Sequence, residues 1–270
     1  MGKIISVVNQ KGGVGKTTTS VNLGAYLASL GKHVLIVDID PQANASSGLG
    51  IDHKNIDYGI YEAIVGKRDI REVLKRTVVD KYLIAPATAE LAGASVELVS
   101  MEEREFILQN LLEKLRDDFD YIIIDGPPSL GLMTINSLVA ADDIIIPIQS
   151  EYYALEGLGQ LLETINLVKE NLKPSLNIMG AVVTMYDKRN KLSGLVLQEL
   201  EKHFPNKIFN TVIPRSVRLA EAPSYGKTIM HYDAHSRGGK AYEMLAQEII
   251  GMEGLQINEN IEKPDLYFGD

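Results

Sequence analysis

Apolar runs rich in β-branched residues alternate along most of the chain with segments whose apolar positions recur at helical spacing. The runs predict strands at residues 3–8, 33–37, 81–85, 121–124, 143–148, 177–184 and 208–213. Several runs are apolar throughout instead of alternating, which is typical of parallel strands covered on both faces. The segments with helical spacing predict helices at residues 17–30, 101–116, 130–140, 155–171, 192–203 and 239–250.

This order of elements predicts one α/β domain over residues 1–250, with a doubly wound, mostly parallel sheet and helices on both faces. Ligands of such sheets bind at the carboxyl ends of the strands, so the loops there are the expected place of the chemistry. The pattern changes after Ile250. Residues 251–270 contain Gly251, Gly254, five acidic residues and one lysine, and they predict a flexible acidic tail.

The loop between the first predicted strand and the first predicted helix is rich in glycine. It reads Lys11-Gly12-Gly13-Val14-Gly15-Lys16-Thr17-Thr18. A strand, such a loop and a helix bind phosphate, because the loop N–H groups and the helix N-terminus converge on anionic oxygens. Lys16 is then expected to reach the β- and γ-phosphates, and the Thr17 hydroxyl to ligate Mg²⁺. The loop therefore predicts a P-loop NTPase fold.

One departure from the common phosphate-loop pattern lies at the start of this loop. The pattern G-x-x-x-x-G-K-[ST] has its first glycine where this chain has Gln10, and a second lysine, Lys11, follows it. Phosphoryl transfer needs positive charge on the γ-phosphate oxygens, and no arginine finger in the same chain is evident. Lys11 is a candidate for that charge, and its place at the start of the loop lets it point away from its own phosphates.

Two further predicted strands end in carboxylates. Asp38 and Asp40 follow the second strand, where two acids at this spacing point to the same side. They are suited to orient a water, accept a proton or hold the magnesium shell, although an acid before a proline turn is also a common strand ending. Asp125 ends an apolar strand, which is the Walker B arrangement for a carboxylate that reaches Mg²⁺.

Composition restricts the classes of protein that this chain can belong to. The 270 residues include no cysteine, which excludes disulfide scaffolds, thiolate metal sites and iron–sulfur clusters. No signal peptide is evident, and no apolar stretch approaches the ~18 residues of a membrane span. We therefore expect a cytoplasmic protein that does not bind membranes.

The charge is unevenly distributed. The chain carries −9 overall, but residues 184–240 hold ten basic and five acidic residues. Charge alone leaves two interpretations open: a solvated surface that happens to be basic, or a surface that binds nucleic acid.

The phosphate loop resembles the deviant Walker A loop of the ParA/MinD ATPases, and the likeness is closest to the chromosomal ParA branch often called Soj. The same likeness covers about residues 1–250. Besides the loop, it rests on Asp38-Ile39-Asp40-Pro41-Gln42, Asp125-Gly126-Pro127-Pro128-Ser129-Leu130-Gly131, Glu151-Tyr152-Tyr153-Ala154-Leu155-Glu156-Gly157 and Val212-Ile213-Pro214-Arg215-Ser216-Val217-Arg218-Leu219-Ala220-Glu221-Ala222-Pro223.

The resemblance implies a slow, Mg²⁺-dependent ATPase that forms a sandwich homodimer around two ATP molecules. Lys11 would then cross to the partner's phosphates, and Asp40 would position the attacking water. Thr17, Asp40 and Asp125 would surround Mg²⁺. The residues implied to contact the nucleotide are Lys11, Gly12, Gly13, Val14, Gly15, Lys16, Thr17, Thr18, Asp125, Met185, Pro214, Arg215 and Ser216. Pro214 and Arg215 would flank the adenine, while Met185 is as well explained by the core.

The resemblance also implies partners. Dimers of this family bind double-stranded DNA without sequence preference, and a ParB-like (Spo0J-like) centromere-binding protein stimulates their hydrolysis. The chain would then partition chromosomes or plasmids and associate with the nucleoid. The candidate DNA-binding residues are Arg189, Arg218, Lys227, Arg237 and Lys240.

Two other functions share this kind of loop. A MinD-like, membrane-bound positioning ATPase needs a basic amphipathic C-terminal helix, whereas residues 251–270 are acidic. A metabolic enzyme, such as an amide-forming enzyme or a reductase component, is a third interpretation. The lack of cysteine removes its iron–sulfur versions, and no glutaminase-like nucleophile is evident.

Overall fold

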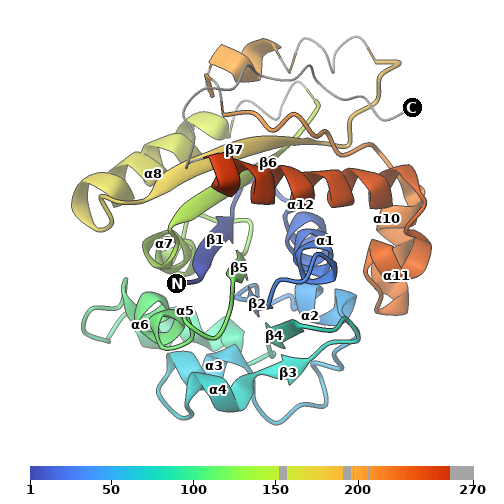
Figure 1. Ribbon diagram of the computed structural model, residues 1–270. Coiled ribbons are helices and arrows are strands. Elements are labelled where there is room, and N and C mark those ends of the chain that lie inside the picture. Colours follow the sequence, from blue (N-terminus) through green and yellow to red (C-terminus); the bar gives the residue numbers. More distant parts are fainter. Residues whose placement is uncertain (152–156, 191–195, 197, 203, 206, 256–270) are drawn as a thin grey trace.

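A computed structural model describes the chain except for residues 152–156, 191–195, 197, 203, 206 and 256–270. Its centre is a seven-stranded sheet of order β3-β4-β2-β5-β1-β6-β7, in which only β3 runs antiparallel (Figure 1). The strands are β1 (Lys3–Val7), β2 (Val34–Asp38), β3 (Lys75–Arg76), β4 (Tyr82–Ala85), β5 (Tyr121–Asp125), β6 (Asp143–Gln149) and β7 (Asn177–Thr184). The doubly wound, mostly parallel sheet expected from the sequence is confirmed.

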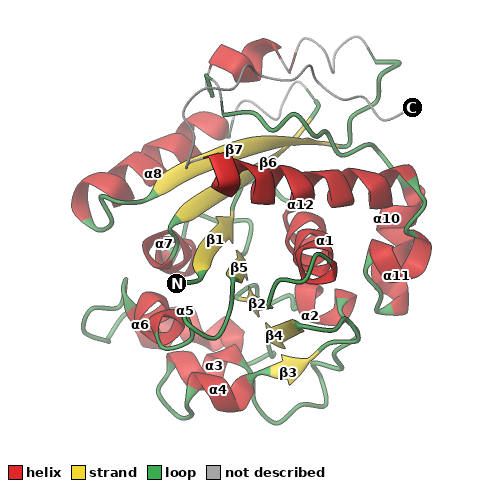
Figure 2. Cartoon of the chain, viewed as in Figure 1, coloured by secondary structure: helices red, strands yellow, loops and turns green. Residues whose placement is uncertain are grey.

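Helices cover both faces of the sheet (Figure 2). They are α1 (Lys16–Ser29), α2 (Asn44–Gly48), α3 (Ile60–Ile64), α4 (Ile70–Val73), α5 (Leu91–Leu98), α6 (Ile107–Glu113), α7 (Leu132–Ala140), α8 (Leu158–Asn171), α10 (Val217–Glu221), the 3₁₀ helix η2 (Ala222–Tyr225), α11 (Ile229–Asp233) and α12 (Arg237–Leu255). Side chains of α1 and α12 fill the core on one face, and those of α6, α7 and α8 fill it on the other. Within the described ranges, no helix is both long and apolar enough to cross a bilayer.

The last predicted strand, at residues 208–213, is absent as a regular strand. The segment follows β7 through isolated bridges from Ala181 to Ile208 and from Tyr186 to Pro214. Between these bridges, the N–H groups of Asn210 and Thr211 donate to the carboxylate of Glu248 on α12, at 2.7 and 3.0 Å. Because a side chain takes these donors, the ladder cannot form there.

Several helix boundaries also differ from the prediction. The helix expected at residues 101–116 is shortened to α6, and the one at 239–250 extends over Arg237–Leu255, into the predicted tail. The helix expected from residue 155 is described only from Leu158, and parts of the one at 192–203 lie outside the described residues. The shorter elements α2–α5, β3, α10 and α11 were not predicted, because two to eight residues show no clear hydrophobic period.

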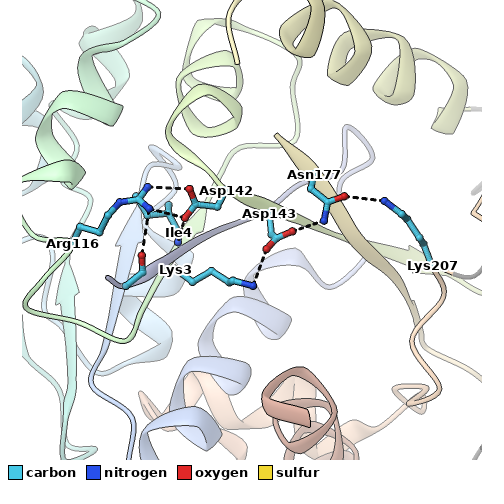
Figure 3. Close-up of polar contacts among 8 residues, drawn as sticks. Lys3, Ile4, Arg116, Asp142, Asp143, Asn177 and Lys207 are labelled. Atoms are coloured by element: carbon cyan, nitrogen blue, oxygen red, sulfur yellow. Dashed lines mark hydrogen bonds and ion pairs between the residues drawn. The ribbon is translucent and has the colours of Figure 1, made fainter. Parts of the chain in front are cut away.

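A network of polar side chains joins the amino ends of the strands (Figure 3). Arg116 binds Asp142 through two hydrogen bonds of 3.1 and 3.0 Å. Next to this pair, Lys3 lies 3.0 Å from Asp143, which also accepts a hydrogen bond from Asn177. Lys3, Asp143 and Asn177 begin β1, β6 and β7. The network therefore joins the amino ends of these three neighbouring strands, at the edge of the sheet opposite the phosphate loop.

Candidate nucleotide-binding site

The phosphate loop connects β1 to α1 at the carboxyl edge of the sheet. Gly13 and Gly15 have φ angles of 73° and 91°, a region that residues with a Cβ rarely adopt. Gly15 directly precedes α1, so the loop N–H groups and the helix N-terminus are directed at the same space. The loop geometry expected from the sequence thus depends on glycine at these two positions.

Neighbouring strand ends hold the loop in place. The Thr184 hydroxyl at the end of β7 donates to the Val14 carbonyl at 2.7 Å, and the Asn9 amide donates to the Pro147 carbonyl at 2.8 Å. The Gln10 amide, at the position of the missing first glycine, donates to the Gly157 carbonyl at 2.8 Å. Gly157 directly precedes α8. The replacement of glycine by Gln10 therefore links the loop to the start of α8.

The two lysines of the loop have different surroundings. Lys16 is buried, with 7% of its surface exposed, and its ammonium donates to the Lys11 carbonyl at 3.2 Å. Burial lowers the Lys16 pKa, while the charges of Asp125 and Asp40 oppose that shift. Lys11 is half-exposed, and among the described residues no acid forms an ion pair with it. Lys16 is thus placed for phosphates bound to its own chain, and Lys11 remains available to a second molecule.

Asp125 is completely buried at the end of β5. Its Oδ1 accepts a hydrogen bond of 2.8 Å from the Ser20 hydroxyl, whereas its Oδ2 has no hydrogen-bond partner among the described residues. Burial raises the Asp125 pKa, and hydrogen bonds from the Ser20 and Thr17 hydroxyls lower it. A buried carboxylate oxygen without a partner, beside the Thr17 hydroxyl, is a suitable partner for Mg²⁺ or its bound water.

Asp38 and Asp40 have separate positions in the structure. Asp38 lies opposite Asp125 in the β2–β5 register and is fully buried. It accepts hydrogen bonds from the Ser46 N–H and hydroxyl at 2.8 and 2.7 Å, and from the Asp40 N–H at 3.2 Å. Burial raises the Asp38 pKa, and the charge of Asp125 raises it further. Asp38 therefore fixes the loop after β2, and this loop places Asp40 at the rim of the site.

A cavity of about 520 Å³ lies over the phosphate loop. Such a volume is within the range of small-molecule sites. It brings together these predicted residues: Gly12, Gly13, Gly15, Lys16, Thr17, Thr18, Asp40 and Met185. Val14 is buried and contributes its backbone, while Asp125 lies beneath the cavity. Within the described residues, no group of three His, Cys, Asp or Glu side chains could hold a metal. The magnesium shell would therefore consist mainly of phosphate and water oxygens, as is usual for this ion.

Pro214, Arg215 and Ser216, which the resemblance implies to contact the nucleotide, do not line this cavity. Pro214 and Arg215 line a second cavity of about 610 Å³, and Ser216 directly precedes α10. The two cavities meet at adjacent residues, because Met185 lines the first and Tyr186 the second. The expected role of Pro214, Arg215 and Ser216 stays a prediction.

The candidate DNA-binding residues lie in three places. Arg189, Arg237 and Lys240 line the second cavity, Lys227 lines the nucleotide cavity, and Arg218 lines neither of them. Arg218 approaches Glu221 at 3.2 Å and Asp233 at 3.5 Å. Arg189 is paired with Asp187 at 2.8 Å, which lowers the Asp187 pKa to about 2. The cations thus do not form one group, and three of the five are gathered at one cavity.

Sequence reasoning missed several supporting residues: Asn9, Ser20, Ser46 and Thr184. Each is a small polar residue whose role depends on a tertiary contact, such as that of Ser20 with Asp125. Ser20 and Asp125 are 105 positions apart. Of these four residues, only Thr184 could have been found from the sequence, because it ends a predicted strand at the expected edge of the sheet.

Comparisons with known proteins agree with this geometry. A family model described as an AAA domain matches residues 2–178. The chain is 54% identical over 249 residues to the sporulation initiation inhibitor protein Soj of Bacillus subtilis (strain 168), covering 92% of this chain and 98% of the relative. It is 50% identical over 250 residues to the chromosome partitioning protein ParA of Myxococcus xanthus (strain DK1622), covering 93% and 88%.

Among solved structures, the cobyrinic acid a,c-diamide synthase of Mycobacterium smegmatis with bound ADP and magnesium is similar at a TM-score of 0.84. The sequence identity is 35%, and the match covers 100% of both chains. The likeness therefore extends over the whole architecture and includes a protein that holds a nucleotide and magnesium.

Proposed function

The chain belongs to the Soj/ParA group of the ParA/MinD ATPases, and from this membership we propose that it partitions DNA as an ATP-dependent dimer. Lys16 carries the proposal, because a buried lysine over a glycine loop, beside an Asp125 oxygen that has no partner among the described residues, is suited to hold magnesium and a triphosphate. The proposed ATPase domain comprises residues 1–250, and an acidic tail follows at residues 251–270.

Hydrolysis requires a positioned water and neutralised γ-phosphate oxygens. Lys16 and the loop N–H groups hold the phosphates. Thr17 and Asp125 would hold Mg²⁺, which would neutralise phosphate charge when bound. Asp40 lies at the rim of the same cavity, where its carboxylate is placed to orient the attacking water. We assign these roles to the four side chains.

Dimerisation by ATP follows from Lys11. Its half-exposed ammonium is without an acidic partner in the described part of the chain, and it begins the loop that faces the cavity. A second subunit placed over the cavity would receive this charge at its own γ-phosphate. The dimer would thus complete the charge that one chain lacks.

The DNA-binding face would consist of Arg189, Arg218, Arg237 and Lys240, with Lys227 at its border with the nucleotide cavity. Contacts of these cations with phosphates are blind to sequence and weaken with salt, and dimerisation doubles their number. A ParB-like centromere-binding partner would stimulate hydrolysis and so release the DNA. This gives association with the nucleoid in the ATP state.

A mobility-shift titration of double-stranded DNA, with ADP or ATP and across a salt series, tests the proposal. We expect binding with ATP only, without sequence preference, and with affinity that falls steeply as salt rises. Lys16→Ala, which cannot hold ATP, is the matched control and should bind no DNA with either nucleotide. Equal binding with ADP, with ATP and by the Lys16→Ala variant would contradict a nucleotide-controlled DNA switch.

Two other functions are tested by the same preparation. Binding to anionic phospholipid vesicles instead of DNA would favour a MinD-like ATPase. Amide formation remains a candidate because a solved structure with 35% identity is a diamide synthase. The relative from Myxococcus xanthus, which is 50% identical, is named a chromosome partitioning protein, and this favours partitioning.

A further inference from the structure

The second cavity concentrates positive charge in an acidic protein. Its volume of about 610 Å³ is larger than that of the nucleotide cavity. Its lining includes five cations, Lys188, Arg189, Arg215, Arg237 and Lys240, and one acid, Asp187. The chain as a whole carries −9. The cavity is therefore a strong local attractor for an anionic group.

The start of α12 adds to this charge. Arg237 and Lys240 lie in the first turn of this 19-residue helix, which has no acidic residue there. The N-terminus of a helix is itself positive, so two cations at this end repel the helix dipole and leave it uncompensated. An anion placed at this end of the cavity would relieve the repulsion.

The rest of the lining is apolar. Val212, Val217, Ala241 and Met244 contribute aliphatic surface, and Tyr186 and Pro214 lie beside them. Val217 is 72% exposed, so it adds accessible apolar surface to this lining. A phosphate backbone alone would cover the cations and leave this surface in water. The cavity thus fits an occupant that carries both acidic and apolar groups.

Such an occupant is present in the chain's own sequence. Residues 256–270, outside the described part of the structure, contain four acids and one lysine. Their last portion reads Asp265-Leu266-Tyr267-Phe268-Gly269-Asp270, three large apolar residues between two acids. The pattern matches an apolar surface surrounded by cations.

The length of the segment permits the contact. α12 starts at the cavity with Arg237 and ends at Leu255, and its 19 residues rise about 28 Å. The 15 residues that follow span up to roughly 50 Å when extended. The last residues can therefore return along the helix to the cavity.

We propose that residues 265–270 dock in the second cavity, with the acids on the Arg189, Arg237 and Lys240 side and the aromatic rings on the Val217 and Met244 side. On the proposed function, these three cations also bind DNA, so the docked segment competes with DNA. The acidic end of the chain then acts as an internal inhibitor of DNA binding.

The affinity needed for this inhibition is low. A short flexible connection gives an effective concentration on the order of 1 mM. A contact with an intrinsic dissociation constant of about 0.1 mM would therefore be about 90% formed in the intact chain, and it would weaken DNA binding about tenfold.

Disulfide trapping in the full chain tests the docking itself, because the protein has no cysteine of its own. The pair Val217→Cys and Phe268→Cys should form an intramolecular disulfide under mild oxidation. The matched control pairs Phe268→Cys with Val78→Cys, a valine that is 70% exposed and does not line the cavity. We expect trapping of the Val217 pair at least about ten times faster than of the control, at a rate set by the effective concentration. Equal rates, or no disulfide in either pair, would overturn the docking.

A DNA titration with ATP tests the competition. Replacing Tyr267 and Phe268 by serine keeps every cation and every acid, and it should tighten DNA binding about tenfold. Adding the peptide of residues 256–270 at millimolar concentration should reverse the gain. Unchanged affinity in the variant would overturn the competition. If neither protein binds DNA, the proposed function fails, and disulfide trapping still decides the docking.

Discussion

At the scale of single residues, the central feature of the site is a carboxylate whose burial disfavours its charged form. Asp125 is completely buried, its Oδ2 has no hydrogen-bond partner in the described part of the chain, and Asp38 lies opposite it in the register. Burial raises the pKa of both groups above the ordinary range near 4, and the charge of Asp125 raises the pKa of Asp38 further. The arrangement costs stability in the absence of a cation and becomes favourable when Mg²⁺ shares the buried charge.

The sign of the pH dependence follows from these raised pKa values. The folded protein holds protons on the two acids at pH values where the unfolded chain has released them. The free energy of unfolding therefore falls as pH rises from the ordinary carboxyl range through the raised values, and the full cost remains above them. Between about pH 5 and about pH 8, the melting temperature of the nucleotide-free wild type should therefore fall more than that of the nucleotide-free Asp125→Asn variant.

Asp125→Asn keeps an oxygen for Ser20 and removes the buried charge. Above the raised pKa we expect the nucleotide-free variant to melt roughly 2–4 °C higher than the wild type, for each ~1 kcal/mol of charge cost removed. It should also lose the stabilisation that Mg²⁺ and ATP give to the wild type. Scanning calorimetry with and without Mg²⁺-ATP measures both effects. A variant that melts lower and is still stabilised by Mg²⁺-ATP would show that Asp125 is a structural acid.

At the scale of elements, the carboxyl edge of the sheet works as a frame for the phosphate loop. The end of β7 holds Val14 through Thr184, and the start of α8 is held to Gln10 through Gly157. The loop position therefore depends on elements at some distance along the chain. A displacement of β7 or α8 would therefore move the loop relative to bound phosphates.

Thr184→Val tests this frame, because valine has nearly the shape of threonine and lacks the hydroxyl. It would leave the buried Val14 carbonyl without its donor, at a cost of about 1–3 kcal/mol. If the loop bears this cost when it binds phosphate, ATP affinity falls roughly 5–100-fold, as calorimetric titration would measure. Thr164→Val, which removes an exposed hydroxyl on α8, is the matched control. Equal ATP affinity in both variants would show that β7 does not position the loop.

At this scale, local sequence patterns predicted some elements and site residues but not others. The loop, the strands that end in Asp38 and Asp125, and the long helices α1, α8 and α12 follow from local patterns. Ser46 could not be found in this way, because its role comes from contact with Asp38 after the chain turns. Residues 208–213 were predicted as a strand since the pattern is apolar, and only the distant Glu248 prevents it. Tertiary partners thus decide what local propensity cannot.

At the scale of the whole molecule, one chain supplies an incomplete site. Lys16, Thr17 and the glycines of the loop line the cavity, whereas no acid among the described residues forms an ion pair with Lys11. In the ATP-bound dimer that we propose, each chain would supply this charge to the other. Nucleotide state, oligomeric state and the doubled basic face would then be linked by a single residue.

Lys11→Ala separates the binding of ATP from assembly. Because Lys16 and the glycine loop remain, the variant should bind ATP about as well as the wild type, while hydrolysis and the ATP-dependent dimer are lost. Light scattering with ATP measures the mass, and nucleotide titration measures the affinity. Lys11→Arg, which keeps a positive charge, is the matched control and should retain more of the dimer than alanine. If the Lys11→Ala protein still dimerises with ATP, the cross-subunit charge comes from another residue. The proposed division of roles between Lys16 and Lys11 would then be wrong.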